Sequence, residues 1–391
     1  SIFSGDVRLR ESNSSNVSDF HLRESLDMYA TAISKGNGND SLVISDKMYK
    51  GLSGSWENAS VVIWGKGNRI YRRNIIKVNA ENKTIYFKPV NLNKDKNKFI
   101  VVNTPSSLDV PGEYYFEVKR KILYIYPYDT LKEVSYAVRE VGINISADNI
   151  VVRGFVIEKN GSASAINRAG IAVKIYGKNK HKPIHNIKVD GNVIRNHKSI
   201  DQSGVITVLY GNHIQITNNT IQESSPNRGI LVMNSDKVVT KNNIIENIVG
   251  TGIAYFAVNN GRIESNTINK INGVHSNGIS IYLGSKNNYV FNNCVANGLS
   301  AFTTNNAIST VIYANIFHTN VDNYTVADWG GSNELHFYNN VFLNPYSKSL
   351  YISNGTTGVA VLNSVVDGML IKDQSAFISR NLYTKLSWQQ N

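Results

Sequence analysis

The sequence predicts an all-β protein built as a right-handed parallel β-helix, a solenoid in which short strands stack coil upon coil. Three observations lead to this fold. A sequence motif, two short apolar runs on either side of a turn that contains Asn, recurs from about residue 149 to residue 365. The runs alternate apolar and polar residues and are rich in Val, Ile, Thr and Tyr, which is typical of strands. Repeats of two or three short strands without a helix indicate this kind of solenoid.

The recurring phrase is clearest in Ile187-Lys-Val-Asp-Gly-Asn-Val-Ile194 and Ile214-Gln-Ile-Thr-Asn-Asn-Thr-Ile221. Stacked Asn side chains can hydrogen-bond along the axis of a parallel sheet, so we expect them to hold the coils in register and to take no part in chemistry. Aligned on the last Asn, the copies lie 22 to 27 residues apart, at Asn192, Asn219, Asn243, Asn266, Asn293, Asn315, Asn340 and Asn363.

A second marker, Gly followed by Ile or Val, opens one strand in many coils, at Gly170, Gly204, Gly229, Gly252 and Gly278. Each coil of a solenoid buries its apolar side chains only against its neighbours. We place the solenoid at residues 134–380 and a C-terminal tail at residues 381–391.

Residues 1–133 are expected to form an N-terminal cap with an inserted antiparallel β module. A cap is needed because the first coil would otherwise expose its core and its strand edges. Turn signals such as Pro111-Gly112 separate strand-like runs at residues 60–64, 70–78, 84–88, 114–118 and 122–126.

Part of this region resembles a known group of proteins. The phrases are Asn103-Thr-Pro-Ser-Ser-Leu-Asp-Val-Pro-Gly-Glu-Tyr-Tyr-Phe-Glu117, Ile122-Leu-Tyr-Ile-Tyr-Pro127 and the upstream Trp56-Glu-Asn-Ala-Ser-Val-Val-Ile63. They are similar to segments that lead into the repeats of secreted bacterial right-handed β-helix proteins, the pectate-lyase-like superfamily. The resemblance covers roughly residues 50 to 365. It implies a carbohydrate-active enzyme, a glycoside hydrolase or a polysaccharide lyase, and the superfamily hosts several reactions on one scaffold.

Composition narrows the class of partner. The net charge of +12 favours an acidic polymer, such as a uronate or sulfated glycan, only weakly, because some of the lysines lie in solvated Asn-Lys loops. No nucleic-acid-binding motif and no apolar run long enough to span a bilayer is present, so we expect neither partner. The single cysteine, Cys294, excludes an intrachain disulfide, and we expect it to be a small buried residue. The chain begins at Ser1 without Met, which indicates a processed form.

Acidic residues beside the strand openings give the first candidate site. A glycoside hydrolase needs two carboxyl groups about 5 to 10 Å apart, the separation expected for coils one or two apart. Asp322 and Asp328, next to Trp329, are the leading pair, and Asp201 and Glu223 are the next. The alternative for each acid is a turn residue that hydrogen-bonds its own backbone.

A second chemistry is suggested by Arg228, His275 and Tyr282. A lyase or C5-epimerase must neutralise a uronate carboxylate, remove the C5 proton and supply a proton to the product, roles that suit Arg, His and Tyr. The alternatives are that Arg228 pairs with Glu223 and that His275 is a polar turn residue. No strand carries the dense acidic cluster of a Ca²⁺ site, so no metal or other cofactor is expected, although Ca²⁺ stays open.

Aromatic residues indicate the kind of ligand. Sugars stack their apolar C–H faces on aromatic rings while their hydroxyls bind polar groups such as Asn277. The alternative for each Tyr is a row of rings inside the solenoid. Similar places in successive strands are held by Tyr176, Tyr210, Tyr255 and Tyr282, and Trp329 follows.

From the sequence we therefore expect a polysaccharide-degrading enzyme that acts outside the cytoplasm, secreted, periplasmic or at the cell surface. Hydrolysis by a carboxyl pair is the first interpretation, and lyase or C5-epimerase action on an acidic glycan is the second. A third interpretation is a non-catalytic carbohydrate-binding or tailspike-like adhesion solenoid. An ice-binding solenoid is disfavoured because regular Thr-x-Thr rows are missing.

Overall fold

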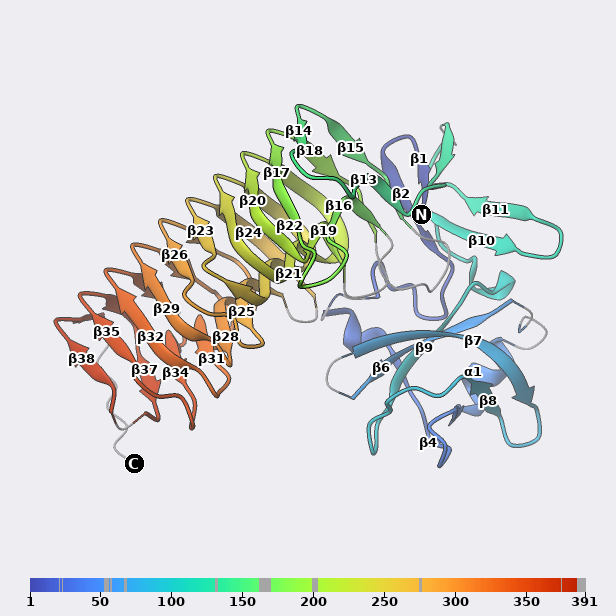
Figure 1. The fold of residues 1–391 in the computed structure, drawn as a ribbon. Coiled ribbons are helices and arrows are strands. Elements are labelled where there is room, and N and C mark those ends of the chain that lie inside the picture. Colours follow the sequence, from blue (N-terminus) through green and yellow to red (C-terminus); the bar gives the residue numbers. More distant parts are fainter. Residues whose placement is uncertain are drawn as a thin grey trace. The chain divides into compact units, whose positions relative to one another are not determined.

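The computed structural model describes residues 1–20, 22, 24–52, 56, 58–66, 69–130, 133–161, 170–198, 203–273, 276–373 and 375–384. The chain divides into two units, one formed by Ser1–Ala137 and one that begins at Val138. The second unit is a right-handed parallel β-helix, as the sequence predicted, and antiparallel sheets dominate the first (Figure 1). In the part of the chain that is described, no helix is long and apolar enough to cross a bilayer.

The first unit contains a seven-stranded antiparallel sheet and a five-stranded sheet. In strand order the larger sheet consists of β3 (Ala30–Thr31), β9 (Lys98–Val102), β6 (Ser60–Gly65), β7 (Arg69–Asn79), β8 (Thr84–Phe87), β5 (Ser41–Val43) and β4 (Ser34–Lys35). The smaller consists of β11 (Ile122–Tyr126), β10 (Glu113–Glu117), β2 (Val7–Glu11), β1 (Ile2–Ser4) and β12 (Val134–Tyr136). Its β10–β2 pair is parallel. Short helices lie at η1 (Glu24–Met28), α1 (Asp46–Gly51) and η2 (Pro105–Ser107).

All five strand-like runs expected in this region are strands, at β6, β7, β8, β10 and β11. The sequence analysis did not predict β9, whose short apolar run directly follows a lysine-rich loop. β9 pairs with β6 and is buried from Phe99 to Val102. The module therefore has its own apolar core, which includes Leu42, Val61, Ile63, Ile85 and Phe99.

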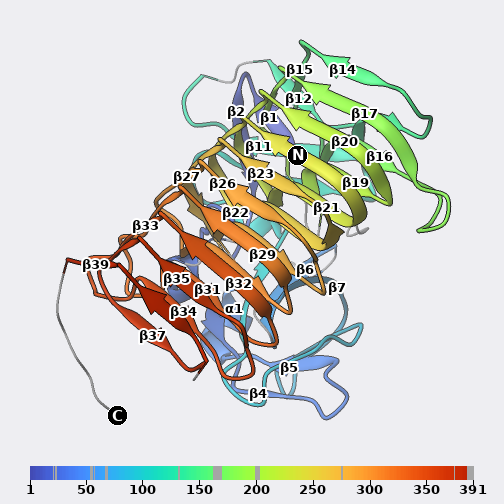
Figure 2. The same ribbon diagram turned by 60° about the vertical axis from the view of Figure 1, so that its left-hand side comes forward.

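The solenoid has three faces, and outside the region of β19 to β24 each strand pairs in parallel with the strand three places later (Figures 1 and 2). Two long strands, β21 (Thr220–Lys241) and β22 (Ile244–Asn259), run around corners and so contribute to more than one face. The first face consists of β13 (Val141–Ile145), β16 (Ile171–Tyr176), β19 (Gly204–Leu209), residues 228–233 and 251–256, β25 (Asn277–Tyr282), β28 (Ser300–Asn305), β31 (Val326–Asp328), β34 (Leu350–Ile352) and β37 (Met369–Ile371).

The other two faces follow the same order. The second consists of β14 (Val151–Arg153), β17 (Ile184–Asp190), β20 (Gly211–Thr217), residues 236–241, β23 (Arg262–Glu264), β26 (Tyr289–Phe291), β29 (Ile308–Tyr313), β32 (Asn333–Tyr338), β35 (Ala360–Leu362) and β38 (Phe377–Ser379). The third consists of β15 (Val156–Glu158), β18 (Val193–Arg195), the first residues of β21 and β22, β24 (Thr267–Asn272), β27 (Cys294–Val295), β30 (Ile316–His318), β33 (Val341–Leu343), β36 (Val365–Val366) and β39 (Leu382–Tyr383).

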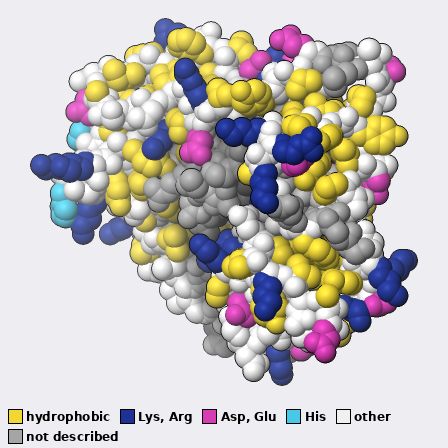
Figure 3. Space-filling view, turned by 90° about the vertical axis from the view of Figure 1, so that its right-hand side faces the viewer, with side chains coloured by type: hydrophobic (Ala, Val, Ile, Leu, Met, Phe, Trp, Pro, Cys, Tyr) yellow, Lys and Arg dark blue, Asp and Glu magenta, His cyan; other side chains and the backbone are white. Residues whose placement is uncertain are grey.

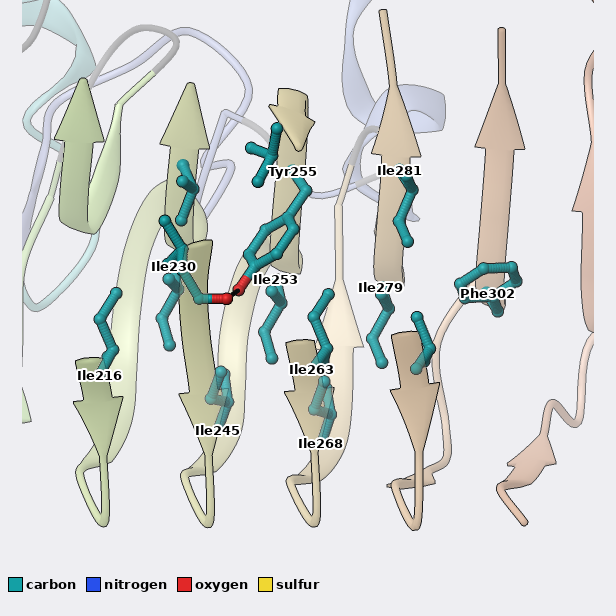
Figure 4. Close-up of a cluster of buried hydrophobic side chains, with 14 of the residues drawn as sticks. Ile216, Ile230, Ile245, Ile253, Tyr255, Ile263, Ile268, Ile279, Ile281 and Phe302 are labelled. Atoms are coloured by element: carbon teal, nitrogen blue, oxygen red, sulfur yellow. Dashed lines mark hydrogen bonds between the residues drawn. The ribbon is translucent and has the colours of Figure 1, made fainter. Parts of the chain in front are cut away.

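The interior is filled by columns of Ile, Val and Phe that meet from all three faces (Figure 4). Ile253, Ile279 and Phe302 are successive members of one column and are fully buried. Burial of each such side chain contributes roughly 1.5–3 kcal/mol to folding, so each coil depends on its neighbours for stability.

The predicted Asn ladder is present. The Nδ2 of Asn219 donates to Oδ1 of Asn243 at 3.0 Å and to the carbonyl of Val189 at 3.0 Å, so one side chain joins three coils. The same pattern links Asn192 through Asn340.

The ladder ends differently from the prediction. Its next position is Ser364, whose Oγ accepts from the amide of Asn340, while Asn363 precedes it with φ of 49°. Asn339 holds the same left-handed position one coil earlier, with φ of 54°. The sequence alignment was wrong by one residue here, because both turn positions favour Asn.

The recurrent glycines have a steric reason. At Gly252 a Cβ atom would lie 2.5 Å from the carbonyl oxygen of Gly278, and at Gly278 it would lie 2.5 Å from the carbonyl oxygen of Ala301. Successive coils approach too closely at this corner for a larger residue. The glycine of the Gly-Ile marker is therefore required by the close packing of successive coils.

Replacing Asn266 by Ala is expected to lower the free energy of unfolding by about 3 kcal/mol, because several buried partners would lose their hydrogen bonds. Its side chain donates to Thr240, Glu264 and Asn293 and accepts from Asn243. Denaturant unfolding followed by circular dichroism measures the loss. Exposed Asn259→Ala is the matched control. Equal midpoints for the two variants would contradict a stabilising ladder.

His197 gives a pH-dependent prediction. It is fully buried, its Nε2 lies 3.1 Å from the carbonyl oxygen of Ile157, and burial lowers its pKa to about 4. The unfolded state therefore takes up the proton first as the pH falls. Stability from neutral His197 is complete above about pH 6.5 and is lost toward pH 4, by up to about 3 kcal/mol.

Denaturant unfolding at pH 7 and pH 5 tests this expectation. His197→Gln should flatten the pH dependence, whereas exposed His181→Gln should leave it unchanged. If wild type and His197→Gln lost the same unfolding free energy between pH 7 and pH 5, His197 would not be the source of the pH dependence.

Candidate functional site

The first face of the solenoid carries three outward columns of side chains. One contains Arg228, Thr251, Asn277 and Ser300, the middle one contains Ala254, Ser280 and Thr303, and the third contains Met233, Phe256, Tyr282 and Asn305. The middle residues are small and buried. The second and third columns follow from the alternation of side chains between the two sides of a strand. The column of Arg228 lies at the start of the strand segment, directly after the register shift between Ser224 and Asn227. We call Arg228, Phe256, Tyr282, Thr303 and Trp329 the polar–aromatic strip.

One end of the strip is a cation held over an aromatic ring. The Arg228 guanidinium carbon lies 5.0 Å from the centroid of the Phe256 ring. Phe256 stacks on Tyr282 with centroids 5.6 Å apart and planes 5° from parallel. This order places a cation, an apolar ring and a phenol on three successive coils. The cation–π contact fixes the guanidinium over the face of the Phe256 ring.

The Tyr282 hydroxyl is held by polar neighbours. It donates to Oγ1 of Thr303 at 2.9 Å, and Ser280 lies 2.9 Å from the same Thr303 oxygen. Burial raises the pKa of Tyr282 above its usual value, while hydrogen bonds with Thr303, Ser280 and Trp329 and the positive charge of Arg228 act in the opposite direction. Tyr282 therefore keeps its proton at neutral pH and can donate it.

Trp329 continues the strip at the end of β31. Its indole is 46% exposed and lies 5.8 Å from Tyr351, centroid to centroid. Tyr351 stacks on Tyr324 at 4.8 Å. The Thr304–Asp328 register places Trp329 beside Asn305, two coils after Tyr282. Rings and polar groups thus line several coils in succession.

The two carboxyl groups of the leading pair, Asp322 and Asp328, lie in different environments, one exposed and one buried. Asp322 is exposed and forms an ion pair with Lys348. Asp328 is 1% exposed and lies in the inward column between Thr304 and Ile352. The expectation that both carboxyl groups line the groove is wrong for Asp328, because strand alternation turns its side chain toward the interior.

Of the second acidic pair, Glu223 is exposed in a turn with φ of 51°, and its Oε1 accepts from Nδ2 of Asn247 at 2.7 Å. This turn joins the third face to the first. Asp201 lies outside the described residues. No Asp or Glu occupies an outward position in the strands of the first face that the structure describes from β16 to β34.

The predicted row of tyrosines is only partly on the surface. Tyr176 and Tyr282 lie in the outward column, half-buried, but the members between them are Leu209, Met233 and Phe256. Tyr210 follows β19 in a turn with φ of 55°. Tyr255 points into the solenoid, is fully buried, and its hydroxyl lies 2.8 Å from that of Thr240 (Figure 4). An offset of one residue moved these two positions out of the column.

Asn277 belongs to the column of Arg228 but is 7% exposed, and its Nδ2 donates to Ser280 at 3.2 Å. Asn277 is therefore a buried residue that hydrogen-bonds to the middle column and does not itself form part of the exposed surface. His275 lies outside the described residues. Sequence reasoning missed Phe256, Ser280 and Thr303. Ser280 directly follows a Gly-Ile pair, so the sequence could have indicated it. The coil of Thr303 has no such pair, and its place follows only from the pairing of Thr303 with Ser280.

Cys294 is exposed, not buried as expected, because it lies at an outward position of the third face, level with Thr267 and Ile316. Among the described residues, no three His, Cys, Asp or Glu side chains come together in a way that could hold a metal ion.

Charge does not mark a site by itself. The view in Figure 3 shows Lys and Arg side chains scattered among apolar and acidic ones, without a single large basic field. Some cations have acidic partners, as in the Lys241–Glu264 pair at 2.7 Å and the Arg262–Glu264 pair at 2.8 Å. Arg228 stands out by its position beside Phe256 and Tyr282 rather than by the charge around it.

The fold defines a class of protein, the right-handed parallel β-helices, and one solved structure with this architecture is described as a glycoside hydrolase. Residues 162–357, half of the chain, match the family model described as "Periplasmic copper-binding protein (NosD)". The protein belongs to the NosD family. The described residues offer no ligand cluster for the copper in that description.

Solved structures agree on the architecture. One described as a glycoside hydrolase superposes with a TM-score of 0.62 at 12% identity, covering 97% of this chain and 76% of that one. At this identity the likeness shows the fold alone. The mannuronan C-5 epimerase AlgE6 A-module of Azotobacter vinelandii has a TM-score of 0.32 at 14% identity, covering 62% of this chain and 89% of that one, too low to carry an argument. No curated protein matches the sequence.

The position of Tyr255 can be tested by its stability effect. Tyr255→Phe should lower the free energy of unfolding by about 1–2 kcal/mol, because Thr240 would lose a buried hydrogen-bond partner. Tyr289→Phe, at a 47% exposed position, should change it by less than about 0.5 kcal/mol. Thermal and denaturant unfolding measure both. Equal effects would mean that Tyr255 is not the buried residue described.

Proposed function

We propose that the protein binds and modifies an anionic polysaccharide along the polar–aromatic strip, outside the cytoplasm. The observation that carries this proposal is the run of Arg228, Phe256 and Tyr282 on consecutive coils, at a face whose described outward strand positions hold no acidic residue. A guanidinium suits a carboxylate or sulfate, and exposed rings suit the C–H faces of sugars. The family description as periplasmic supports the location.

For a uronate chain, this arrangement favours proton transfer at C5 over hydrolysis. Arg228 would pair with the substrate carboxylate and stabilise the negative charge that develops when the C5 proton is removed. In β-elimination the C5–H and C4–O bonds break, a C4–C5 double bond forms, and Tyr282 gives its proton to the leaving oxygen. In C5-epimerisation the proton returns to the opposite face of C5. The base would come from outside this trio, and His275 is the sequence candidate.

Hydrolysis is the second candidate, and the structural likeness to a glycoside hydrolase favours it. It needs a pair of carboxyl groups facing the sugar. Asp328 is buried and accepts hydrogen bonds from several hydroxyls, and Asp322 forms an ion pair with Lys348. A hydrolase would therefore depend on other acids, such as Asp201 and Glu223. A non-catalytic member of the family that only binds glycans is the third outcome to be distinguished.

Incubation with uronate, sulfated and neutral glycans distinguishes these functions. Elimination gives ultraviolet absorbance from unsaturated uronate together with new reducing ends. Epimerisation in deuterated water gives deuterium at C5 without cleavage. Reducing ends without absorbance would establish hydrolysis and contradict the proposal, and binding without turnover would establish a binding protein.

Variants assign the roles. Arg228→Gln and Tyr282→Phe should each lower turnover about 100-fold, because a charge-stabilising group and a proton donor are lost. Tyr289→Phe on the second face and Asp322→Asn should leave turnover unchanged. Loss of activity in Asp322→Asn, with Arg228→Gln active, would move the site away from the strip.

A further inference from the structure

Trp329 occupies an unusual corner of the solenoid. It is one of the exposed large side chains, at 46%, yet its backbone is firmly held: its amide donates to the carbonyl of Thr304 at 2.9 Å. Gly330 and Gly331 follow with φ of 120° and 70°, backbone conformations that residues with a Cβ atom rarely adopt. The chain therefore turns sharply after Trp329 and leaves the indole exposed at the end of the strip.

The residue before it anchors this corner. The Asp328 carboxyl group accepts five hydrogen bonds, from the hydroxyls of Thr304, Ser332, Ser353 and Thr356 and from the amide of Gly330. Thr304 belongs to the preceding coil, Gly330 and Ser332 to the turn itself, and Ser353 and Thr356 to the following coil. One buried carboxyl group thus fixes three successive coils where Trp329 emerges.

The ring neighbours of Trp329 are also held in place. Tyr351 stacks on Tyr324 with centroids 4.8 Å apart, and the Lys372 ammonium lies 5.7 Å from the centroid of Tyr351. Trp329 leans on Tyr351 at 45°. Among Tyr324, Trp329 and Tyr351, only Trp329 is exposed.

We propose that Trp329 is a sugar-stacking residue at the far end of the polar–aromatic strip, and that Asp328 is a positioning residue that holds it there. The occupant is a pyranose ring of the glycan chain whose anionic group binds Arg228, so the identity of the ligand rests on the proposed function. An apolar C–H face stacks on an indole, while the Tyr324 and Tyr351 hydroxyls and the Lys372 ammonium bind sugar oxygens.

The coil spacing sets the length of ligand that reaches both ends. Arg228 and Trp329 belong to coils four steps apart through Thr251, Asn277, Ser300 and the β28–β31 register, which is roughly 19 Å at one inter-strand spacing per coil. Only an oligosaccharide of several residues spans this distance. Affinity should therefore rise with chain length until Trp329 is reached.

The test is binding of glycan oligosaccharides of graded length, read by tryptophan fluorescence and by calorimetry, with no turnover required. Trp329→Ala should weaken binding of long oligosaccharides about tenfold and leave short ones unchanged. Trp329→Phe should restore part of the loss. Tyr346→Ala is the control, since Tyr346 is 53% exposed and does not stack on Trp329 or Tyr351.

Asp328→Asn tests the positioning role. It should lower the affinity for long oligosaccharides, keep that for short ones, and increase the mobility of Trp329 measured by fluorescence anisotropy. A purely structural role would lower stability and weaken short and long ligands alike. That result would overturn the assignment of Asp328.

The inference and the proposed function fail separately. If long glycans bind equally well to wild type and Trp329→Ala, the stacking role is wrong, while turnover that depends on Arg228 would still support the function. If oligonucleotides but not glycans quench Trp329, the ligand class is wrong. If no glycan of any length changes Trp329 fluorescence or gives a calorimetric signal, the inference is overturned.

Discussion

The structure depends on hydrogen bonding along the solenoid axis. Apart from the first and last coils, every strand of the β-helix is hydrogen-bonded to equivalent strands in the coils before and after it. The Asn ladder repeats this bonding through side chains inside one turn. No coil is stable alone, because its apolar side chains are buried only by its neighbours. This axial bonding fixes which residues lie at the same level on successive coils, and therefore which side chains share a column.

The candidate site is a product of that register. Phe256 and Tyr282 each lie four residues after the glycine marker of their coil, whereas Arg228 precedes its own marker, and the parallel pairing brings the three into contact. The arrangement is rigid because each residue is held by a strand paired on both sides. A surface of this kind suits recognition of a polymer, since its repeat along the axis can follow a repeating ligand.

Polar residues divide into two groups according to the side of the strand on which they lie. Asp328 and the ladder Asn residues face inward, where several donors or acceptors satisfy each one, and their contribution is to the geometry of the coils. Arg228, Tyr282 and Trp329 face outward and remain partly exposed. The acidic residue that looked most catalytic in the sequence is thus the one most fully enclosed, and the residue next to it is the exposed one.

The sequence by itself determined the fold class, the positions of the coils, five strands of the N-terminal unit and most of the ladder, because alternation, glycine and asparagine follow from local strand and turn geometry. It also pointed to Arg228, Tyr282 and Trp329. Only the tertiary structure decided that Tyr255 and Asp328 point inward, that Ser364 continues the ladder and that Phe256 joins Arg228 to Tyr282. A shift of one residue reverses the side on which a strand residue lies, and irregular turns make that shift invisible until neighbouring coils are paired.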